Sequence, residues 1–199
     1  MSGLTYEDVS GGVGLRVTVP VTMGPDGAAR ELAPRLSALA GERAPASPHG
    51  EPARATRAVP VVTIDGYSGS GKSTLAAALA RLVNGWQVLH LDDWYPGWDG
   101  LEAGADIARR IAADLRAGRA SSYEAWDWEH GTTGATIRVP LAPTIIEGCG
   151  AIEVEADLAV WIADPGEEER RTRALARDGQ TYAPHWQRWA DQDLGRSIH

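Results

Sequence analysis

The chain has 199 residues, of which 43% are hydrophobic and 23% charged, a composition typical of a globular protein that buries its own core. Its formal net charge of −8 disfavours broad binding to nucleic acids or to anionic membranes, and we expect neither as a partner. Cys149 is the only cysteine, which excludes an intramolecular disulfide and favours a reducing compartment. No membrane-length apolar run and no signal peptide are visible, so we expect a cytoplasmic protein.

The N-terminal part of the chain carries the least information. Residues 15–23 alternate between apolar and polar side chains and predict a strand, which Pro20 would confine to a sheet edge. Residues 27–41 predict a helix that Pro34 interrupts or starts. Residues 41–60 are rich in Pro, Ala, Gly and charge, as linkers are. We therefore expect a partly ordered extension and linker over residues 1–58, followed by the main domain over residues 59–199.

A phosphate-binding loop is predicted where the main domain begins. Residues 61–64 form an apolar, β-branched run typical of a buried strand, and an Ala/Leu-rich helix is predicted over residues 74–82. Between them, residues 66–73 read GYSGSGKS and match G-x-x-x-x-G-K-[ST] without a mismatch. The alternative is a Gly/Ser turn that matches by chance, but the flanking strand and helix supply the context that the motif requires.

Each part of this loop has a physical role in binding ATP with Mg²⁺. Its glycines let backbone N–H groups approach the phosphates, and the helix N-terminus adds unpaired N–H groups. Lys72, the only lysine of the chain, would reach the β- and γ-phosphates, and the Ser73 hydroxyl would ligate Mg²⁺. The predicted nucleotide-binding residues are Gly66, Tyr67, Ser68, Gly69, Ser70, Gly71, Lys72, Ser73 and Thr74.

Beyond this loop, strands and helices alternate. Three further strands are predicted over residues 86–91, 143–146 and 158–162, and two helices over residues 107–117 and 167–177. Residues 94–104 look turn-rich, and residues 121–140 look like a loop with short extended pieces. This alternation predicts an α/β fold, a three-layer α/β/α sandwich with a mostly parallel sheet.

Acidic residues follow the predicted strands, where such sheets bind their ligands. Asp92 is the candidate base for an attacking hydroxyl and Glu147 the candidate acid on the metal side, although single acids at strand ends are often loop starters or caps. Asp93 is a weaker candidate, and Asp164 fits a helix cap better. Arg173 and Arg177 share a helix face and could close over a triphosphate, or could form Glu–Arg pairs on a solvated helix.

These motifs together resemble the uridine kinase-like branch of the P-loop nucleoside and nucleotide kinases, over residues 59–179. The points of similarity are GYSGSGKST, LDDWYPGWDGL, EAWDW, TIIEGCG and the R-x-x-x-R-D run that begins at Arg173. The resemblance implies that Asp92 is the base on a sugar hydroxyl, that Glu147 helps to hold Mg²⁺ and that Arg173 and Arg177 clasp the phosphates.

The acceptor side matches the family less closely. An aromatic-Asp-aromatic motif lines the nucleoside pocket of that family, and Trp126, Asp127 and Trp128 are similar to it, with Trp-Asp-Trp in place of the usual Tyr-Asp-Phe. Together with Tyr95, these residues suit a flat ring, whereas each single aromatic residue also fits simple packing. The N-terminal extension is foreign to the family.

The sequence thus predicts a kinase that transfers the γ-phosphoryl of ATP to a hydroxyl of a nucleoside-like small molecule. The alternatives are a kinase of another small hydroxyl metabolite or of a nucleoside monophosphate, and a nucleotide-dependent regulatory or binding ATPase. A GTPase is disfavoured because no N-K-x-D motif can form with Lys72 as the only lysine. Neither the acceptor nor the choice between monomer and homodimer follows from the sequence.

Overall fold

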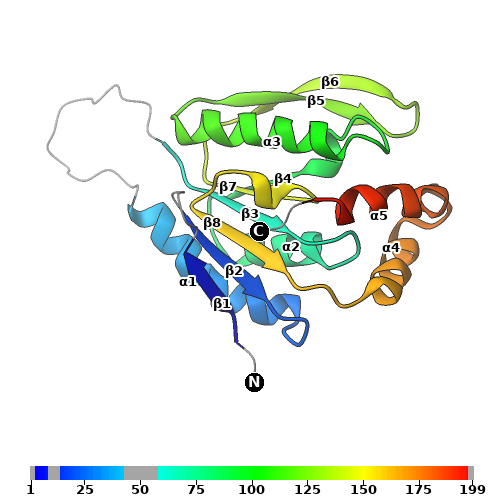
Figure 1. Ribbon diagram of the computed structural model, residues 1–199. Helices are drawn as coiled ribbons and strands as arrows, with labels where there is room; N and C mark the ends of the chain where they lie inside the picture. The colour runs from blue at the N-terminus through cyan, green and yellow to red at the C-terminus, as the bar shows by residue number, and fades with distance from the viewer. Residues whose placement is uncertain (1–2, 9–13, 43–57, 197–199) are drawn as a thin grey trace, which may run out of the picture.

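The computed structural model describes residues 3–8, 14–42 and 58–196 (Figure 1). Within these residues a six-stranded sheet has the order β1-β2-β8-β3-β7-β4. Neighbouring strands run parallel except for β1 and β2, which are antiparallel. The strands of this sheet are β1 Thr5–Asp8, β2 Leu15–Val19, β3 Val61–Asp65, β4 Gln87–His90, β7 Thr144–Glu147 and β8 Leu158–Ile162. The predicted α/β class with a mostly parallel sheet is confirmed.

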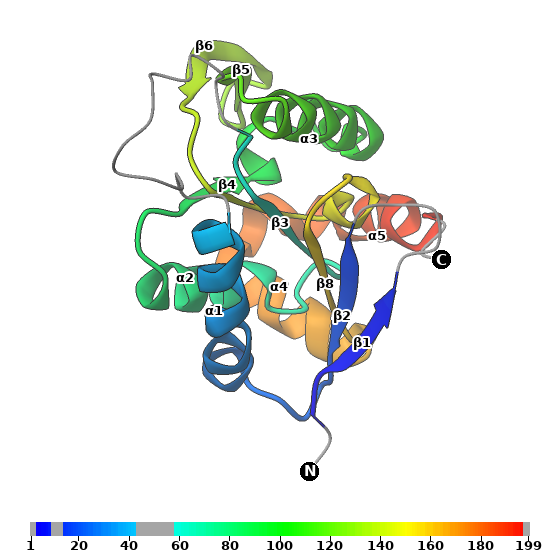
Figure 2. The ribbon, with the colours of Figure 1, turned by 90° about the vertical axis from the view of Figure 1, so that its left-hand side faces the viewer.

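Helices cover both faces of the sheet. Figure 2 shows α1 and α2 on one side and α3 and α5 on the other. The helices are α1 Pro25–Glu42, α2 Lys72–Leu82, α3 Leu101–Arg116, α4 Glu167–Tyr182 and α5 Trp186–Leu194, with short 3₁₀ turns η1 Leu91–Asp93, η2 Ala151–Glu153 and η3 Ala183–His185. None of the helices in the described ranges is long and apolar enough to cross a membrane.

The strand sequences explain why the sheet is buried on both faces. Successive side chains of a strand point to opposite faces. Val61 therefore belongs to the apolar core beneath α3 and α5, whereas Val62 and Ile64 belong to the core beneath α1 and α2. In β7, Ile145 and Ile146 are divided between the two cores in the same way.

The N-terminal segment differs from its prediction in two respects. Strand β2 is not at an edge, because β1 pairs with its outer side, and it ends at Val19 rather than at residue 23. Pro20 therefore lies just beyond the hydrogen-bonded ladder, where its missing N–H has no consequence. Helix α1 runs through Pro34 without a break and begins at Pro25. The predicted linker lies almost entirely outside the described residues.

Two elements of the middle region also differ from their predictions. The stretch expected to be a loop with short extended pieces is an antiparallel hairpin, β5 Ser121–Asp127 and β6 Thr132–Val139, whose register shifts between Glu124 and Trp126. Helix α3 begins at Leu101, within the stretch that looked turn-rich. The Trp94 indole donates a hydrogen bond to the Gly104 carbonyl (2.9 Å), and a Cβ at Gly104 would lie 2.3 Å from the Tyr95 ring. Gly104 is thus needed for close packing of the first turns of α3, although glycine lowers the predicted helix propensity.

Candidate functional site

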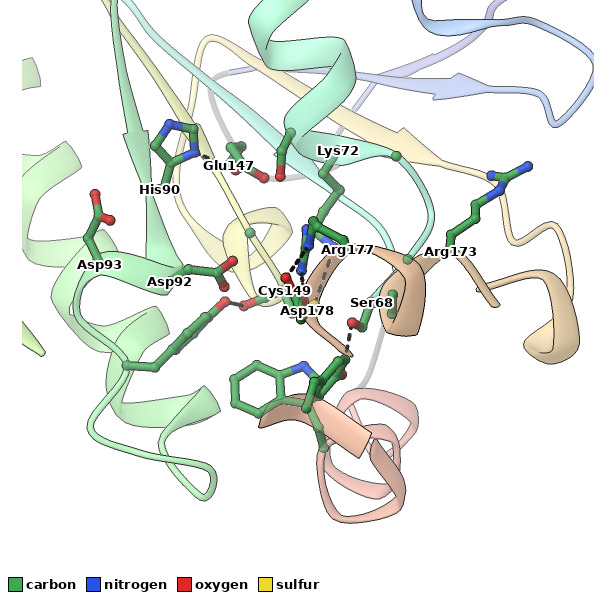
Figure 3. A pocket seen from close by; sticks show the side chains of 18 of the residues that line it. Ser68, Lys72, His90, Asp92, Asp93, Glu147, Cys149, Arg173, Arg177 and Asp178 are labelled. Carbon is green, nitrogen blue, oxygen red and sulfur yellow. Dashed lines mark hydrogen bonds and ion pairs between the residues drawn. The ribbon is translucent and has the colours of Figure 1, made fainter. Parts of the chain in front are cut away.

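A cavity of about 880 Å³ lies at the carboxyl ends of β3, β4 and β7 (Figure 3). This is the edge of a parallel sheet where ligands are expected to bind. The cavity is lined by Ser68, Gly69, Gly71, Lys72, Ser73, Thr74, His90, Asp92, Asp93, Tyr95, Trp98, Trp128, Glu147, Gly148, Cys149, Arg173, Ala174, Arg177, Asp178, Thr181, Tyr182 and Trp189.

The loop between β3 and α2 presents unpaired backbone amides. Among the described residues, no acceptor is found for the N–H groups of Gly69, Gly71, Lys72 and Ser73. Gly69 and Gly71 adopt positive φ angles of 82° and 106°, a conformation that side chains with a Cβ rarely adopt. Free amides at a helix N-terminus bind anions. The loop therefore has the donors and the backbone shape of a phosphate site.

Lys72 is held beside these amides. Its side chain is only 9% exposed, and Nζ donates to the Tyr67 carbonyl oxygen (3.2 Å) and contacts the Cys149 sulfur (3.4 Å). Burial alone would lower the pKa of Lys72, but Cys149 and the carboxylates of Asp193, Glu147 and Asp65 raise it above its ordinary value. Lys72 therefore remains a cation, as a phosphate ligand must.

Glu147 lies opposite the loop, at the end of β7. Its carboxylate is 3% exposed and lies 2.5 Å from His90 Nδ1. Burial opposes ionisation, but the hydrogen bond from His90, the charge of Lys72 and a hydrogen bond from Ser73 lower the pKa of Glu147 overall. Glu147 and Ser73 thus offer a carboxylate and a hydroxyl oxygen side by side, which are ligands that Mg²⁺ accepts.

Magnesium would take few ligands from the protein itself. The described ranges contain no group of three or more His, Cys, Asp or Glu side chains arranged to hold a metal ion. Mg²⁺ bound in nucleotide sites usually takes one or two protein oxygens and completes its coordination with phosphates and water. The donors of Glu147 and Ser73 fit that arrangement.

His90 was not among the predicted site residues. In the register of β4 and β7 it lies directly opposite Glu147. The pKa of His90 is raised above its ordinary value of 6.5. The hydrogen bond to Glu147 is the largest cause of this rise, and burial opposes it. The sequence contained one indication of this role, since His90 comes directly before the Leu91-Asp92-Asp93 strand end.

Asp92 faces the cavity from the 3₁₀ turn that follows β4 (Figure 3). The cavity walls partly desolvate its carboxylate and raise its pKa, and the negative charge of Glu147 acts in the same direction. The positive charges of Lys72 and Arg177 oppose this rise. A carboxylate with a raised pKa accepts a proton more readily than an ordinary aspartate.

The side chains of Arg173 and Arg177, which were predicted to act together, point in different directions in the structure. Arg177 lines the cavity near Lys72 and pairs with Asp178 (Nη2–Oδ2 2.6 Å), while Arg173 points away from Lys72 in Figure 3 and pairs with Glu169 (2.8 Å). Both arginines are about half exposed. These ion pairs match the alternative prediction of a solvated helix with several acid–Arg pairs. Binding of phosphates by Arg173 and Arg177 stays a prediction.

The predicted acceptor residues are only partly in the cavity. Asp93, Tyr95 and Trp128 line it, whereas Trp126 and Asp127 do not. Asp127 accepts hydrogen bonds from the backbone N–H groups of Glu129 and His130 in the hairpin turn.

Aromatic residues from several elements meet around Trp98. The ring of Trp98 stacks on His185 with a centroid distance of 4.4 Å and packs against Trp128 at 4.7 Å. The Trp128 indole donates a hydrogen bond to the Asp92 carbonyl oxygen (2.7 Å). Tyr95 is almost fully buried and donates to the Cys149 carbonyl oxygen (2.7 Å). The rings of Tyr95, Trp98 and Trp128 all line the cavity.

Three residues of the predicted loop, Gly66, Tyr67 and Ser70, do not line the cavity. Tyr67 packs against the Trp161 ring at 5.4 Å, and the hydroxyl oxygen of Ser70 is buried without a hydrogen-bond partner in the described part of the chain. The Gly66 N–H donates to the Asp65 carboxylate (2.6 Å). Phosphate contacts in this geometry therefore fall to the free amides of Gly69, Gly71, Lys72 and Ser73.

Comparisons with known proteins give similar folds but no family assignment. No protein-family model and no curated sequence matches the chain. A possible uridine kinase from Bacillus stearothermophilus is similar in structure, with a TM-score of 0.46, 21% identity, and coverage of 82% of this chain and 92% of the other. A protein provisionally assigned as a fructose transport system kinase from Silicibacter sp. has a TM-score of 0.45, 22% identity, and coverage of 78% and 86%. Scores and identities this low carry no information about the substrate.

Proposed function

We propose that the chain is a phosphotransferase that moves the γ-phosphoryl group of ATP to a hydroxyl group of a small molecule. One observation carries this proposal: unpaired amides and a buried lysine lie on one side of a single cavity, and a carboxylate with a raised pKa lies on the other. The first set suits the phosphates, and the second suits the hydroxyl that attacks them.

The proposed reaction assigns a role to each part of the cavity. The amides of Gly69, Gly71, Lys72 and Ser73 and the Lys72 ammonium hold the β- and γ-phosphates and oppose the charge that develops on them. Asp92 accepts the proton of the acceptor hydroxyl while the oxygen of that hydroxyl forms a bond to the γ-phosphorus. The bond from this phosphorus to the β–γ bridging oxygen breaks, and ADP leaves. When bound, Mg²⁺ would be held by Glu147 and Ser73 and would supply further positive charge to the phosphates.

The acceptor that fits best is uncharged and carries a flat ring, as a nucleoside does. Apart from His90, which is bound to Glu147, the cations that line the cavity are Lys72, Arg173 and Arg177. They come from α2 and α4, and both arginines are paired with acids. The opposite wall carries Asp92, Asp93 and the rings around Trp98. A second phosphate would meet carboxylates there, which disfavours a nucleoside monophosphate.

The rival proposal is a nucleotide-dependent regulatory ATPase. A sensor of this kind needs the loop and Mg²⁺ but no base for an acceptor hydroxyl, so the position and raised pKa of Asp92 favour the kinase.

The test is ATP consumption by the purified protein with Mg²⁺ and a panel of nucleosides, nucleotides and sugars. We expect one class of acceptor to stimulate the rate, and Asp92→Asn to lose about 100-fold or more in kcat while still binding ATP. Asp106→Asn, at an exposed position on α3, is the matched control. Slow hydrolysis that no acceptor stimulates, unchanged in Asp92→Asn, would favour the regulatory ATPase instead.

A further inference from the structure

All three polar groups of Ser68 in the phosphate loop are bound by the last two helices of the chain. Its backbone N–H donates to Asp193 Oδ2 (2.8 Å), its carbonyl oxygen accepts from Arg170 Nη1 (3.3 Å), and its hydroxyl oxygen accepts from the Tyr182 hydroxyl (2.9 Å). These partners are separated from Ser68 by more than one hundred residues in the sequence. The contacts are therefore a product of the tertiary fold rather than of the local loop sequence.

The three partners are buried side chains. Asp193 is 1% exposed, Arg170 3% and Tyr182 4%. A hydrogen bond between buried groups is costly to break, because each group left without its partner has no water to replace it. The loop is thus attached firmly to α4 and α5 at this residue.

Asp193 also belongs to a buried ion network that reaches the base of the loop. Its second carboxylate oxygen pairs with Arg196 (2.6 Å), and Arg196 pairs with Asp65 (2.7 Å). Asp65 is the last residue of β3 and accepts the N–H of Gly66. The network therefore fixes the loop both where it leaves the strand and at Ser68.

These attachments decide which amides remain for a ligand. The Ser68 N–H is taken by Asp193 and the Ser70 N–H by the Tyr67 carbonyl (3.0 Å), while those of Gly71, Lys72 and Ser73 find no acceptor among the described residues. Helix α4 also touches the loop directly, since a Cβ at Gly69 would lie 2.2 Å from the Arg170 carbonyl oxygen. The loop is thereby held in the one shape that leaves its later amides open to the cavity.

We infer that Asp193 is a positioning residue for phosphate binding: it holds the loop through the Ser68 N–H without touching the nucleotide. This inference rests on the proposed function, because it concerns the same phosphate site. It assigns a functional role to the end of the chain, which the motif itself does not include.

Charge and hydrogen bonding at Asp193 have opposite effects on phosphates, which makes the inference testable. As a negative charge, Asp193 repels a triphosphate, so removing the charge alone would tighten binding. As a hydrogen-bond acceptor it orders the loop, so removing the acceptor would weaken binding. Asp193→Asn keeps an acceptor oxygen and removes the charge, whereas Asp193→Ala removes both.

The experiment is calorimetric titration of the full chain with MgATP and with magnesium tripolyphosphate. We expect Asp193→Ala to weaken both ligands by the same factor, about tenfold, because the loop contacts only phosphates. Asp193→Asn should bind both within about threefold of the wild type or more tightly. Asp191→Ala is the control, since Asp191 is exposed on the same helix and its carboxylate accepts a hydrogen bond from the Gln187 side chain.

The outcomes separate this inference from the proposed function. A folded Asp193→Ala protein that binds both ligands as tightly as Asp191→Ala overturns the role of Asp193. Should Asp193→Ala not fold, Asp193→Leu fills the same space without an acceptor for the Ser68 N–H, and an affinity for tripolyphosphate in that variant equal to that of Asp191→Ala overturns the inference as well. A wild-type protein that binds neither ligand overturns the proposed function, and the role of Asp193 with it.

Discussion

The two ends of the cavity are built on different principles. The proposed phosphate end consists of backbone amides whose directions are set by buried hydrogen bonds and ion pairs, from Asp65 through Arg196 and Asp193 to Ser68. The acceptor end consists of side chains, with Asp92 and Trp128 joined by one hydrogen bond. A backbone site recognises any polyphosphate, whereas a site made of side chains changes with each substitution. The first end should therefore define the reaction and the second the acceptor.

Helix α5 contacts both ends. At one end Asp193 holds the loop, and at the other Gln192 donates a hydrogen bond to the Trp98 carbonyl oxygen (2.7 Å) and Arg188 pairs with Asp99. The same nine-residue helix thus contacts both the loop and the aromatic residues around Trp98.

The largest expected effect lies at the phosphate end. Lys72→Ala removes the buried cation beside the free amides, and we expect kcat/KM to fall about 1000-fold. Steady-state kinetics with the acceptor that the panel identifies measures this loss. Arg81→Ala, which removes an exposed cation at the end of the same helix, is the control. A kcat/KM within about threefold of the control would show that the loop does not act on phosphates.

The phosphate end could be predicted from the sequence because its information is local. Strand, glycine loop and helix are consecutive from Val61 to Leu82, so the order of residue types was enough to place Lys72 and Ser73. Asp92 and Glu147 were also accessible, because the ends of parallel strands meet at one edge of the sheet.

What the sequence did not reveal depends on distant pairing. The contact between His90 and Glu147 follows from the register of β4 against β7, and the contact between Ser68 and Asp193 spans 125 positions. The β5–β6 hairpin was missed for a different reason: most of β6 is exposed, so it lacks the apolar alternation that marks a half-buried strand.

The next largest effect is on the pH dependence of the reaction. Asp92 must be ionised to accept a proton, and its pKa is raised by desolvation and by Glu147. The rate should therefore fall as the pH is lowered through this raised pKa, by about tenfold for each pH unit below it. Profiles of kcat/KM against pH measure the midpoint of this fall.

Arg177 provides a way to move that midpoint. Its positive charge lowers the pKa of Asp92, so Arg177→Gln should shift the midpoint to higher pH. Arg81→Gln, far from the cavity, should leave it in place. A midpoint that moves to lower pH in Arg177→Gln would contradict the assignment of the titration to Asp92.

A smaller effect is expected on the stability of the fold, through the hydrogen-bonded pair of His90 and Glu147. The pKa of His90 is raised above 6.5 in the folded protein. The bond from His90 to Glu147 therefore stabilises the fold fully below pH 6.5, and this stabilisation is lost as the pH rises through the raised pKa. The melting temperature of the wild type should fall over this window. His90→Gln should lack this fall, and a His90→Gln protein with the same pH dependence as the wild type would show that another group is responsible.

The smallest effect should lie at the acceptor end, where one hydrogen bond holds the backbone of the predicted base. Trp128→Phe keeps an aromatic ring against Trp98 but removes the indole donor to the Asp92 carbonyl. We expect kcat/KM to fall about three- to tenfold, the usual cost of one hydrogen bond, with the affinity for MgATP unchanged. Trp86→Phe, on the opposite face of the sheet, is the control. Because Trp128 contacts none of the loop amides, an equal loss of MgATP affinity would mean that the two ends of the cavity are not independent, and the division between a general phosphate end and a specific acceptor end would have to be abandoned.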